Sequence, residues 1–128
     1  MNNKSLFVPG TIVLTDYRDF DGQVRQGVFC ILYDEALDPN TDHKFNVVAV
    51  KVTTSQKQLG VYSVPLNYDD KNNFLKELSY AMCSKIHVIS KNSIRCSLGR
   101  LEKDTYLHVY KTYKRFQNEM DKELISYI

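Results

Sequence analysis

Two residues of this chain have side chains suited to binding a phosphate group, and both stand beside strongly predicted strands. Arg25 lies in the Gly-containing segment 22–27, just before the apolar run 28–33. Thr53 stands near the end of the run 46–54, whose β-branched residues indicate a buried strand. We expect the loop that carries the guanidinium and the strand end that carries the hydroxyl to converge on one phosphate.

Three histidines are spread along the chain, and one of them lies where proton transfer is expected. His87 falls in a predicted central strand, on the face opposite Ile86 and Val88, and the ordinary pKa of imidazole suits proton transfer near neutrality. His43 lies in a turn-rich loop and His108 on an expected helix, so both are predicted to be structural or exposed. Because no paired His or Cys spacing is present, the sequence predicts neither a metal site nor a cofactor.

Length and composition indicate one ordinary globular domain, which spans residues 1–128. Hydrophobic residues make up 43% of the chain and charged residues 25%, as is typical of a soluble fold. The formal net charge is only +2, so a nucleic-acid binder of this composition needs a local basic patch.

The cysteines and the polar N-terminus predict a cytoplasmic protein. Cys30, Cys83 and Cys96 fall in strand-like runs without Cys-x-x-Cys spacing, which favours reduced and buried thiols. No apolar stretch approaches the ~20 residues of a membrane span, and no secretory leader is predicted. We therefore expect no membrane association.

The hydrophobic pattern predicts five or six short strands followed by one long helix. The expected strands cover residues 11–15, 28–33, 46–53, 61–66, 79–90 and 94–101. An acidic loop is expected at 16–22, a polar loop at 67–73 and one helical turn at 74–78. After Asp104, apolar residues recur at spacings of three and four and predict an amphipathic helix of about five turns. These elements make an α+β domain, most simply a small barrel with the helix packed across it.

Several short motifs accompany this order of elements. They are Pro9-Gly10-Thr11-Ile12-Val13, Arg25, Val52-Thr53, Ser79 and Gly99-Arg100-Leu101. Over roughly residues 8–120, the motifs and the element order resemble the MazF/PemK/Kid family of toxins from bacterial toxin–antitoxin modules. The resemblance implies an SH3-like small β-barrel of five to seven strands with a C-terminal amphipathic helix, assembled as a homodimer. Most members of this family are sequence-specific endoribonucleases, also called mRNA interferases.

The resemblance also implies which residues carry the reaction. In the family, the Arg of the first long loop and the Thr that ends the third strand form the catalytic pair, and here they are Arg25 and Thr53. The chain departs from the family where Gln26 follows Arg25 in place of Pro, and where His87 replaces an Arg found in many members. The catalytic residues expected from this comparison are Arg25, Thr53 and His87.

Metal-independent cleavage of RNA uses the neighbouring 2′-hydroxyl as the nucleophile and leaves a 2′,3′-cyclic phosphate and a 5′-hydroxyl. A guanidinium binds two non-bridging oxygens at once, and a Thr hydroxyl adds a further donor. We expect a single-stranded substrate, because unstacked bases lie on aromatic and basic side chains. The expected RNA-binding residues are Tyr17, Arg18, Phe20, Thr54, Ser55 and Lys57.

Two classes of function remain open at this stage. The first is a toxin endoribonuclease whose cognate antitoxin occupies the RNA groove. The second is a non-catalytic barrel that binds a protein target, as a gyrase-type toxin or a phage or mobile-element regulatory protein does. The second class stays open because some family members use an acid–Arg pair in the strand 79–90, where this chain has Met82 and Ser84.

Overall fold

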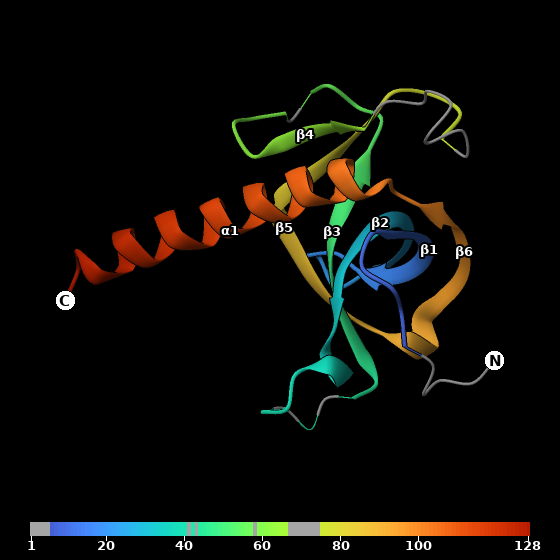
Figure 1. Ribbon diagram of the computed structural model, residues 1–128, viewed down its shortest axis with the longest axis horizontal. Coiled ribbons are helices and arrows are strands. Elements are labelled where there is room, and N and C mark those ends of the chain that lie inside the picture. Colours follow the sequence, from blue (N-terminus) through green and yellow to red (C-terminus); the bar gives the residue numbers. More distant parts are fainter. Residues whose placement is uncertain (1–5, 41, 43, 58, 67–74) are drawn as a thin grey trace.

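The computed structural model shows a six-stranded antiparallel sheet with a long helix lying across it (Figure 1). The structure describes residues 6–40, 42, 44–57, 59–66 and 75–128. The strands are β1 (Thr11–Arg18), β2 (Val24–Asp34), β3 (Asn46–Thr53), β4 (Ser63–Leu66), β5 (Ser79–Ser90) and β6 (Ile94–Arg100). The 3-10 helices η1 (Glu35–Leu37) and η3 (Lys91–Ser93) follow β2 and β5, and the last helix is α1 (Lys103–Ile125).

The strands follow the order β4-β5-β3-β2-β1-β6, and each neighbouring pair is antiparallel. Among the described residues no pairing joins β4 to β6, so the sheet is coiled and barrel-like without being closed. The predicted α+β class, the strand number and the C-terminal helix are confirmed. The predicted bounds of β3 to β6 agree with the observed bounds to within two residues.

Strand β3 lies inside the sheet and is buried on both faces, which explains its unbroken β-branched run. On one face Val50 packs in the same cluster as Val109 of α1. On the other face Val47 and Ala49 pack in a second cluster around Phe29 of β2. Each fully buried aliphatic side chain of this kind contributes about 1.5–3 kcal/mol, so β3 is the part of the fold that anchors its neighbours.

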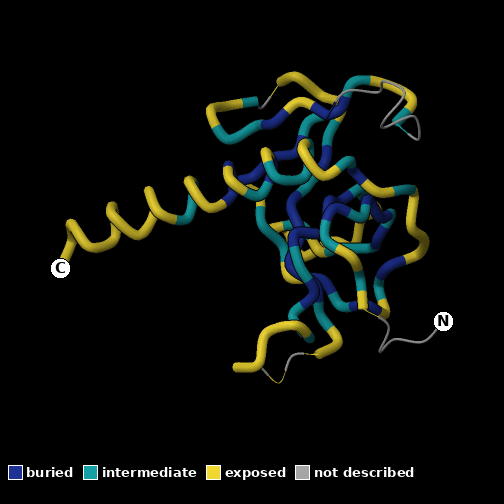
Figure 2. The backbone as a smooth tube through the Cα atoms, in the orientation of Figure 1, coloured by how far each residue is buried: buried dark blue, intermediate teal, exposed yellow. Residues whose placement is uncertain are grey.

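The two halves of α1 differ in burial. The first half buries Val109, Thr112 and Tyr113 against the sheet, as the amphipathic pattern predicts. From Asn118 onward every residue is exposed, and Figure 2 shows this half projecting away from the body of the molecule. The helix has 23 residues, which makes it longer than the five turns expected. No helix in the described ranges is both long and apolar enough to cross a membrane.

The predicted acidic loop at 16–22 is wrong in extent. Strand β1 continues to Arg18 and β2 begins at Val24, so the connection is a tight hairpin. In this hairpin Tyr17 pairs with Arg25 across the two strands. Arg25 therefore lies within a strand rather than in a flexible loop, because cross-strand pairing extends further than the polar composition suggests.

The predicted helical turn at 74–78 is also wrong for the residues that the structure describes. Residues 75–78 are not helical, and Leu75 packs against the main hydrophobic cluster. A single isolated turn is unstable in water, so packing of one apolar side chain decides the local structure. The predicted loop at 67–73, together with Phe74 and His43, lies outside the described residues.

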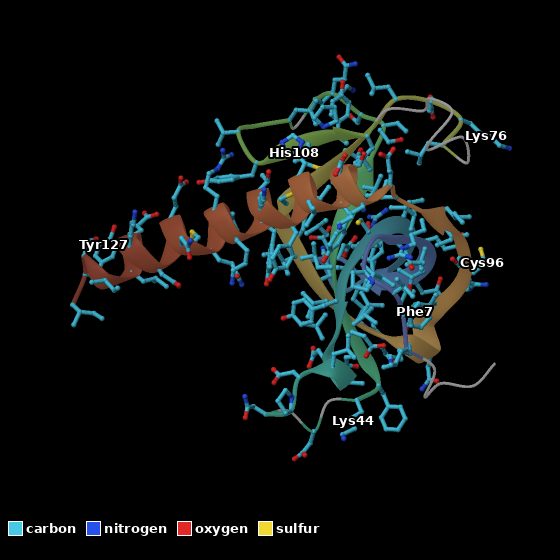
Figure 3. All side chains as sticks on the ribbon, in the orientation of Figure 1. Phe7, Lys44, Lys76, Cys96, His108 and Tyr127 are labelled. Carbon is cyan, nitrogen blue, oxygen red and sulfur yellow. The ribbon has the colours of Figure 1, made fainter. Side chains whose placement is uncertain are left out.

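The cysteines are all free, but they occupy different environments. Cys30 and Cys83 are buried in the main cluster, as expected. Burial raises the pKa of the Cys83 thiol to about 12 and raises that of Cys30 as well. The prediction of burial is wrong for Cys96, which points outward from the edge strand β6 (Figure 3). The edge strand has a partner on one side only, so its outer residues stay in water.

Candidate functional site

A cavity of about 650 Å³ lies between the β1–β2 hairpin, β3 and β5. Its lining includes three cationic side chains, Arg25, Lys51 and Lys85, and two carboxylates, Asp19 and Asp21. This concentration of charge is the local patch that the near-neutral composition requires of a nucleic-acid binder. Because the lining carries both positive and negative side chains, the contacts of each charged side chain decide which ligand the cavity can bind.

Four of the residues predicted from the sequence line this cavity together. They are Tyr17, Phe20, Arg25 and His87. Arg25 and Tyr17 are neighbours across the hairpin, whereas His87 comes from β5 on the far side of β3. The fold therefore brings a guanidinium and an imidazole from distant parts of the sequence to one hollow.

The imidazole of His87 is held by two aromatic rings. Its centroid lies 5.6 Å from that of Tyr17 and 5.0 Å from that of Phe29, with both pairs edge-to-face. The same two rings cover Gly27, where an added Cβ would lie 2.8 Å from a ring carbon of Tyr17. A glycine is therefore needed beneath Tyr17, and the ring it admits orients His87.

Lys51 contacts this aromatic group. Its ammonium donates a hydrogen bond to the Tyr17 hydroxyl and lies 4.2 Å from the Tyr17 ring centroid. Burial, together with the positive charges of Lys51 and Lys85, lowers the pKa of His87 below its ordinary value. The imidazole is therefore neutral at physiological pH, which is the form that accepts a proton.

The Arg25 side chain is half exposed, and its hydrogen-bond partners belong to the β1–β2 hairpin. Its Nε donates to the Asp19 carboxylate, and one terminal nitrogen donates to the Gln23 side chain at 3.2 Å. The pairing raises the pKa of Arg25 and lowers the pKa of Asp19, so both groups stay ionised. The remaining guanidinium N–H groups are not used by these two contacts, and the Arg25 side chain lines the cavity.

Thr53 is placed less centrally than expected. It follows Lys51 by two positions on β3, so both side chains belong to the same face of the strand. Its hydroxyl accepts a hydrogen bond from the backbone N–H of Ser55 at 3.1 Å. Thr53 is not among the described residues that line the cavity, so the fold brings His87 and Lys51, rather than Thr53, into it with Arg25.

The other predicted RNA-binding residues lie around the cavity. Thr54, Ser55 and Lys57 are exposed in the segment that follows β3 and do not line the cavity in the described structure. Arg18 donates to the Gly22 carbonyl at 2.7 Å and lines a second hollow of about 270 Å³. Tyr17 and His87 line both hollows, so Arg18 belongs to a hollow that adjoins the cavity.

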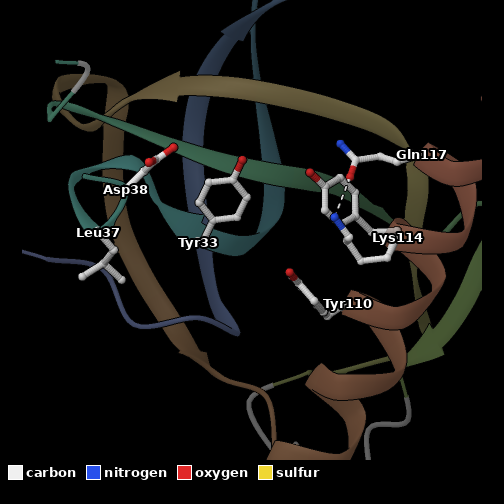
Figure 4. Close-up of a pocket in the computed structure, with 7 residues that line it drawn as sticks. Tyr33, Leu37, Asp38, Tyr110, Lys114 and Gln117 are labelled. Atoms are coloured by element: carbon white, nitrogen blue, oxygen red, sulfur yellow. Dashed lines mark hydrogen bonds between the residues drawn. The ribbon is translucent and has the colours of Figure 1, made fainter. Parts of the chain in front are cut away.

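A different cavity of about 480 Å³ lies between α1 and the end of β2 (Figure 4). Tyr33, Tyr110 and Tyr113 dominate its lining, with Asp38 and Lys114 also present. Burial raises the pKa of Tyr113 to about 12, so this phenol stays protonated near neutrality. No histidine is among the described residues that line this cavity, which makes the hairpin cavity the better candidate for proton transfer.

Lys51, Asp19 and Lys85 line the cavity but were not among the site residues predicted from the sequence. For Lys51 a signal was present, because strand alternation places it on the same face as Thr53. For Asp19 and Lys85 we find no comparable signal. Among the residues that the structure describes, no group of three or more His, Cys, Asp or Glu side chains is arranged to hold a metal ion.

No protein-family model and no curated protein sequence matches this chain. Solved structures do match its fold. MazF from Deinococcus radiodurans superposes with a TM-score of 0.66 at 14% identity, covering 89% of this chain and 98% of that chain. An endoribonuclease from Mycobacterial species superposes with a TM-score of 0.64 at 17% identity, covering 89% and 93%. A Mycobacterial endoribonuclease in complex with its cognate antitoxin gives 0.63 at 17%, covering 88% and 95%. The expected likeness to the MazF toxins is thus confirmed at the level of the fold.

Proposed function

We propose that this chain, which has the fold of the MazF toxins, is itself a toxin that cuts single-stranded RNA as a metal-independent, sequence-specific endoribonuclease. The observation that supports this most is the cavity in which Arg25, Lys51 and a neutral His87 meet. A phosphodiester needs a guanidinium or ammonium for its charge and a base for its 2′-hydroxyl, and these residues supply both.

The reaction proceeds by internal attack of the 2′-oxygen on phosphorus. His87 accepts the proton of the 2′-hydroxyl as the new P–O bond forms, and the bond to the 5′-oxygen breaks. The departing 5′-oxygen takes a proton from water, which leaves a 2′,3′-cyclic phosphate and a 5′-hydroxyl. Arg25 and Lys51 stabilise the negative charge that builds on the non-bridging oxygens, and a single positioned donor contributes about 10²–10³ in rate.

RNA binding extends from the cavity along two directions. Phe20 is 99% exposed at the tip of the hairpin, where an unstacked base can lie on its ring. Arg18 binds a backbone phosphate in the adjoining hollow, which His87 also lines. Thr53 fixes the neighbouring phosphate on β3, and the exposed Thr54, Ser55 and Lys57 continue the track.

The partners follow from the same proposal. We infer a homodimer and a cognate antitoxin that covers the RNA cavity. The support is that the structural neighbours include an endoribonuclease in complex with its cognate antitoxin and a MazE–MazF assembly from Deinococcus radiodurans.

The proposal is tested by digesting a long single-stranded RNA with purified protein in the presence of EDTA. Discrete fragments ending in cyclic phosphate are expected. Arg25→Gln should lower the cleavage rate by about 10²–10³-fold. Arg95→Gln is the matched control, because Arg95 is also paired with a carboxylate but lies on β6 away from the cavity. Intact RNA, or cleavage by Arg25→Gln at the wild-type rate, would contradict the proposal.

A second candidate is a non-catalytic barrel that binds a protein target, such as a gyrase-type toxin or a phage or mobile-element regulatory protein. Asp19 and Asp21 favour it, since two carboxylates at the cavity oppose the entry of a phosphate. Growth arrest on expression, with cellular RNA left whole and unchanged by Arg25→Gln, would support this candidate over the nuclease.

A further inference from the structure

Asp19 connects the hairpin turn to Arg25 through its two carboxylate oxygens. One oxygen, Oδ1, accepts the backbone N–H groups of Asp21 and Gln23, each at 3.0 Å. The backbone N–H of Asp19 also donates to the Gln23 carbonyl at 3.0 Å. The carboxylate is only 12% exposed, so its position is set by the turn rather than by solvent. Its second oxygen, Oδ2, is thereby aimed at Arg25.

This arrangement selects which edge of the guanidinium meets a ligand. A guanidinium can bind a phosphate through its side edge, which includes Nε, or through its two terminal nitrogens. Asp19 occupies Nε, and Gln23 takes one N–H of a terminal nitrogen at 3.2 Å. The side edge is blocked, so the other terminal N–H groups are the ones that remain for a ligand.

We propose that Asp19 is a positioning residue, which holds Arg25 so that the terminal edge of its guanidinium faces the scissile phosphate. This inference rests on the proposed nuclease function and adds a residue to it. The same carboxylate places a negative charge near the RNA backbone, which weakens binding. Asp19 therefore has two effects of opposite sign: it raises the rate of the chemical step and it raises KM.

The chain offers a matched pair of variants that separates these effects. Asp19→Asn keeps an oxygen that can accept the turn N–H groups but removes the charged partner of Arg25. Asp21→Asn removes the same charge from the lining of the same cavity, and no described contact joins the Asp21 side chain to Arg25. We expect Asp19→Asn to lower kcat by about 10–100-fold, as small displacements of a catalytic group do, while KM falls. Asp21→Asn should lower KM and leave kcat unchanged.

A double-variant cycle excludes a purely structural role for Asp19. If Asp19 acts through Arg25, then Asp19→Asn in an Arg25→Gln background should cause no further loss of kcat. General damage to the hairpin would instead lower kcat in both backgrounds and would overturn the inference. NMR of the Arg25 Nε–H group gives a readout without catalysis, because loss of the Asp19 contact should speed its exchange with water.

The outcomes distinguish this inference from the proposed function. If the wild-type protein cuts RNA and Asp19→Asn cuts with the wild-type kcat or faster, Asp19 does not position Arg25, and the nuclease proposal stands. If the wild-type protein leaves RNA whole, both fail. In that case an unchanged affinity of Arg25→Gln for fully 2′-O-methylated single-stranded RNA would also show that the cavity does not bind an RNA backbone.

Discussion

Two ion pairs in this molecule join the same kinds of group in opposite surroundings. The pair between Lys91 and Asp34 has an N–O distance of 2.6 Å, and its two side chains are 1% and 0% exposed. The pair between Arg25 and Asp19 has side chains that are 53% and 12% exposed, and it lies at a cavity. The first ties η3 to the end of β2, whereas the second spans the β1–β2 hairpin.

The difference lies in what else each cation is able to contact. Asp34 also accepts hydrogen bonds from the backbone N–H groups of Phe7 and Ala36, each at 2.9 Å. Both oxygens of the buried carboxylate therefore have partners within the protein. Asp19 likewise accepts backbone N–H groups of the hairpin turn, but its partner Arg25 is half exposed and lines the cavity. The two pairs thus differ in the burial of the cation: Lys91 is enclosed by the protein, whereas Arg25 is half exposed and can still contact a ligand.

The comparison is tested most strongly at Lys91. Lys91→Met leaves the Asp34 carboxylate buried without its cation, and we expect a loss of about 3–5 kcal/mol in the free energy of unfolding. This is a large share of the 5–15 kcal/mol typical of whole domains. Urea denaturation followed by circular dichroism measures it.

The control for this prediction is the double variant Lys91→Met with Asp34→Asn. Removing the charge from both partners should recover part of the loss, because the penalty comes from the isolated carboxylate. If Lys91→Met costs no more than an average surface substitution, the pair does not hold η3 to β2 and the contrast with Arg25 fails.

A second prediction concerns the packing of Tyr17, which is the cross-strand neighbour of Arg25. In Gly27→Ala the new Cβ would lie 2.8 Å from the Tyr17 ring and 3.2 Å from the Phe29 ring, so Tyr17 must move. We expect a loss of about 1–3 kcal/mol in stability from this overpacking. We also expect reduced RNA cleavage, since Tyr17 contacts both Lys51 and His87.

Gly60→Ala is the matched control, because an added Cβ there would meet no atom within 4 Å. It should leave thermal unfolding and cleavage nearly unchanged. If the two substitutions had equal effects, the position of the Tyr17 ring would not depend on the absence of a side chain at Gly27.

The regular elements of this fold could be predicted from the sequence because burial imposes periodicity on them. The run around Val50 is β-branched since both faces of β3 are covered, and the helix after Asp104 repeats apolar residues every three or four positions. The hairpin was mistaken for a loop because its strands are polar where they line the cavity. Arg25 was therefore expected in a loop, although Tyr17 pairs with it across the strands.

The site could be predicted only in part, because its contacts join residues far apart in the chain. The resemblance to a toxin family pointed to Arg25, and the ordinary pKa of imidazole pointed to His87. Nothing local to Lys91 indicates that it is buried, since a lysine in a tight connection is normally exposed. Its burial depends on Asp34, which is 57 positions away, and the residues next to Lys91 in the sequence do not indicate that contact.

A third prediction uses pH to test the environment of His87. Burial and the cations Lys51 and Lys85 lower its pKa, so the imidazole stays neutral until the pH falls below its ordinary value of about 6.5. Cleavage should therefore persist below pH 6.5 and decline as the pH falls through the lowered pKa. The stability contributed by the neutral imidazole should be lost earlier, as the pH falls from about 6.5 to the lowered pKa, because the unfolded chain binds the proton first.

Lys51→Met removes one of the two cations and should raise the pKa of His87 toward its ordinary value. NMR titration of the His87 ring protons measures the change directly. An unchanged His87 titration in Lys51→Met would show that Lys51 does not act on the imidazole electrostatically.

The smallest effect is expected at a third pair, between Arg95 of β6 and Asp16 of β1. This pair has the best geometry of the three, with two hydrogen bonds at 2.9 and 3.1 Å, but its side chains are 55% and 31% exposed. Exposed pairs of this kind often contribute nothing measurable, because water and salt screen them. Arg95→Gln should leave the urea midpoint, the cleavage rate and their salt dependence as in the wild type. A clear loss of stability in Arg95→Gln would mean that the geometry of an ion pair matters more than its burial. Exposure to solvent would then not explain why Lys91 contributes more to stability than the exposed pairs do.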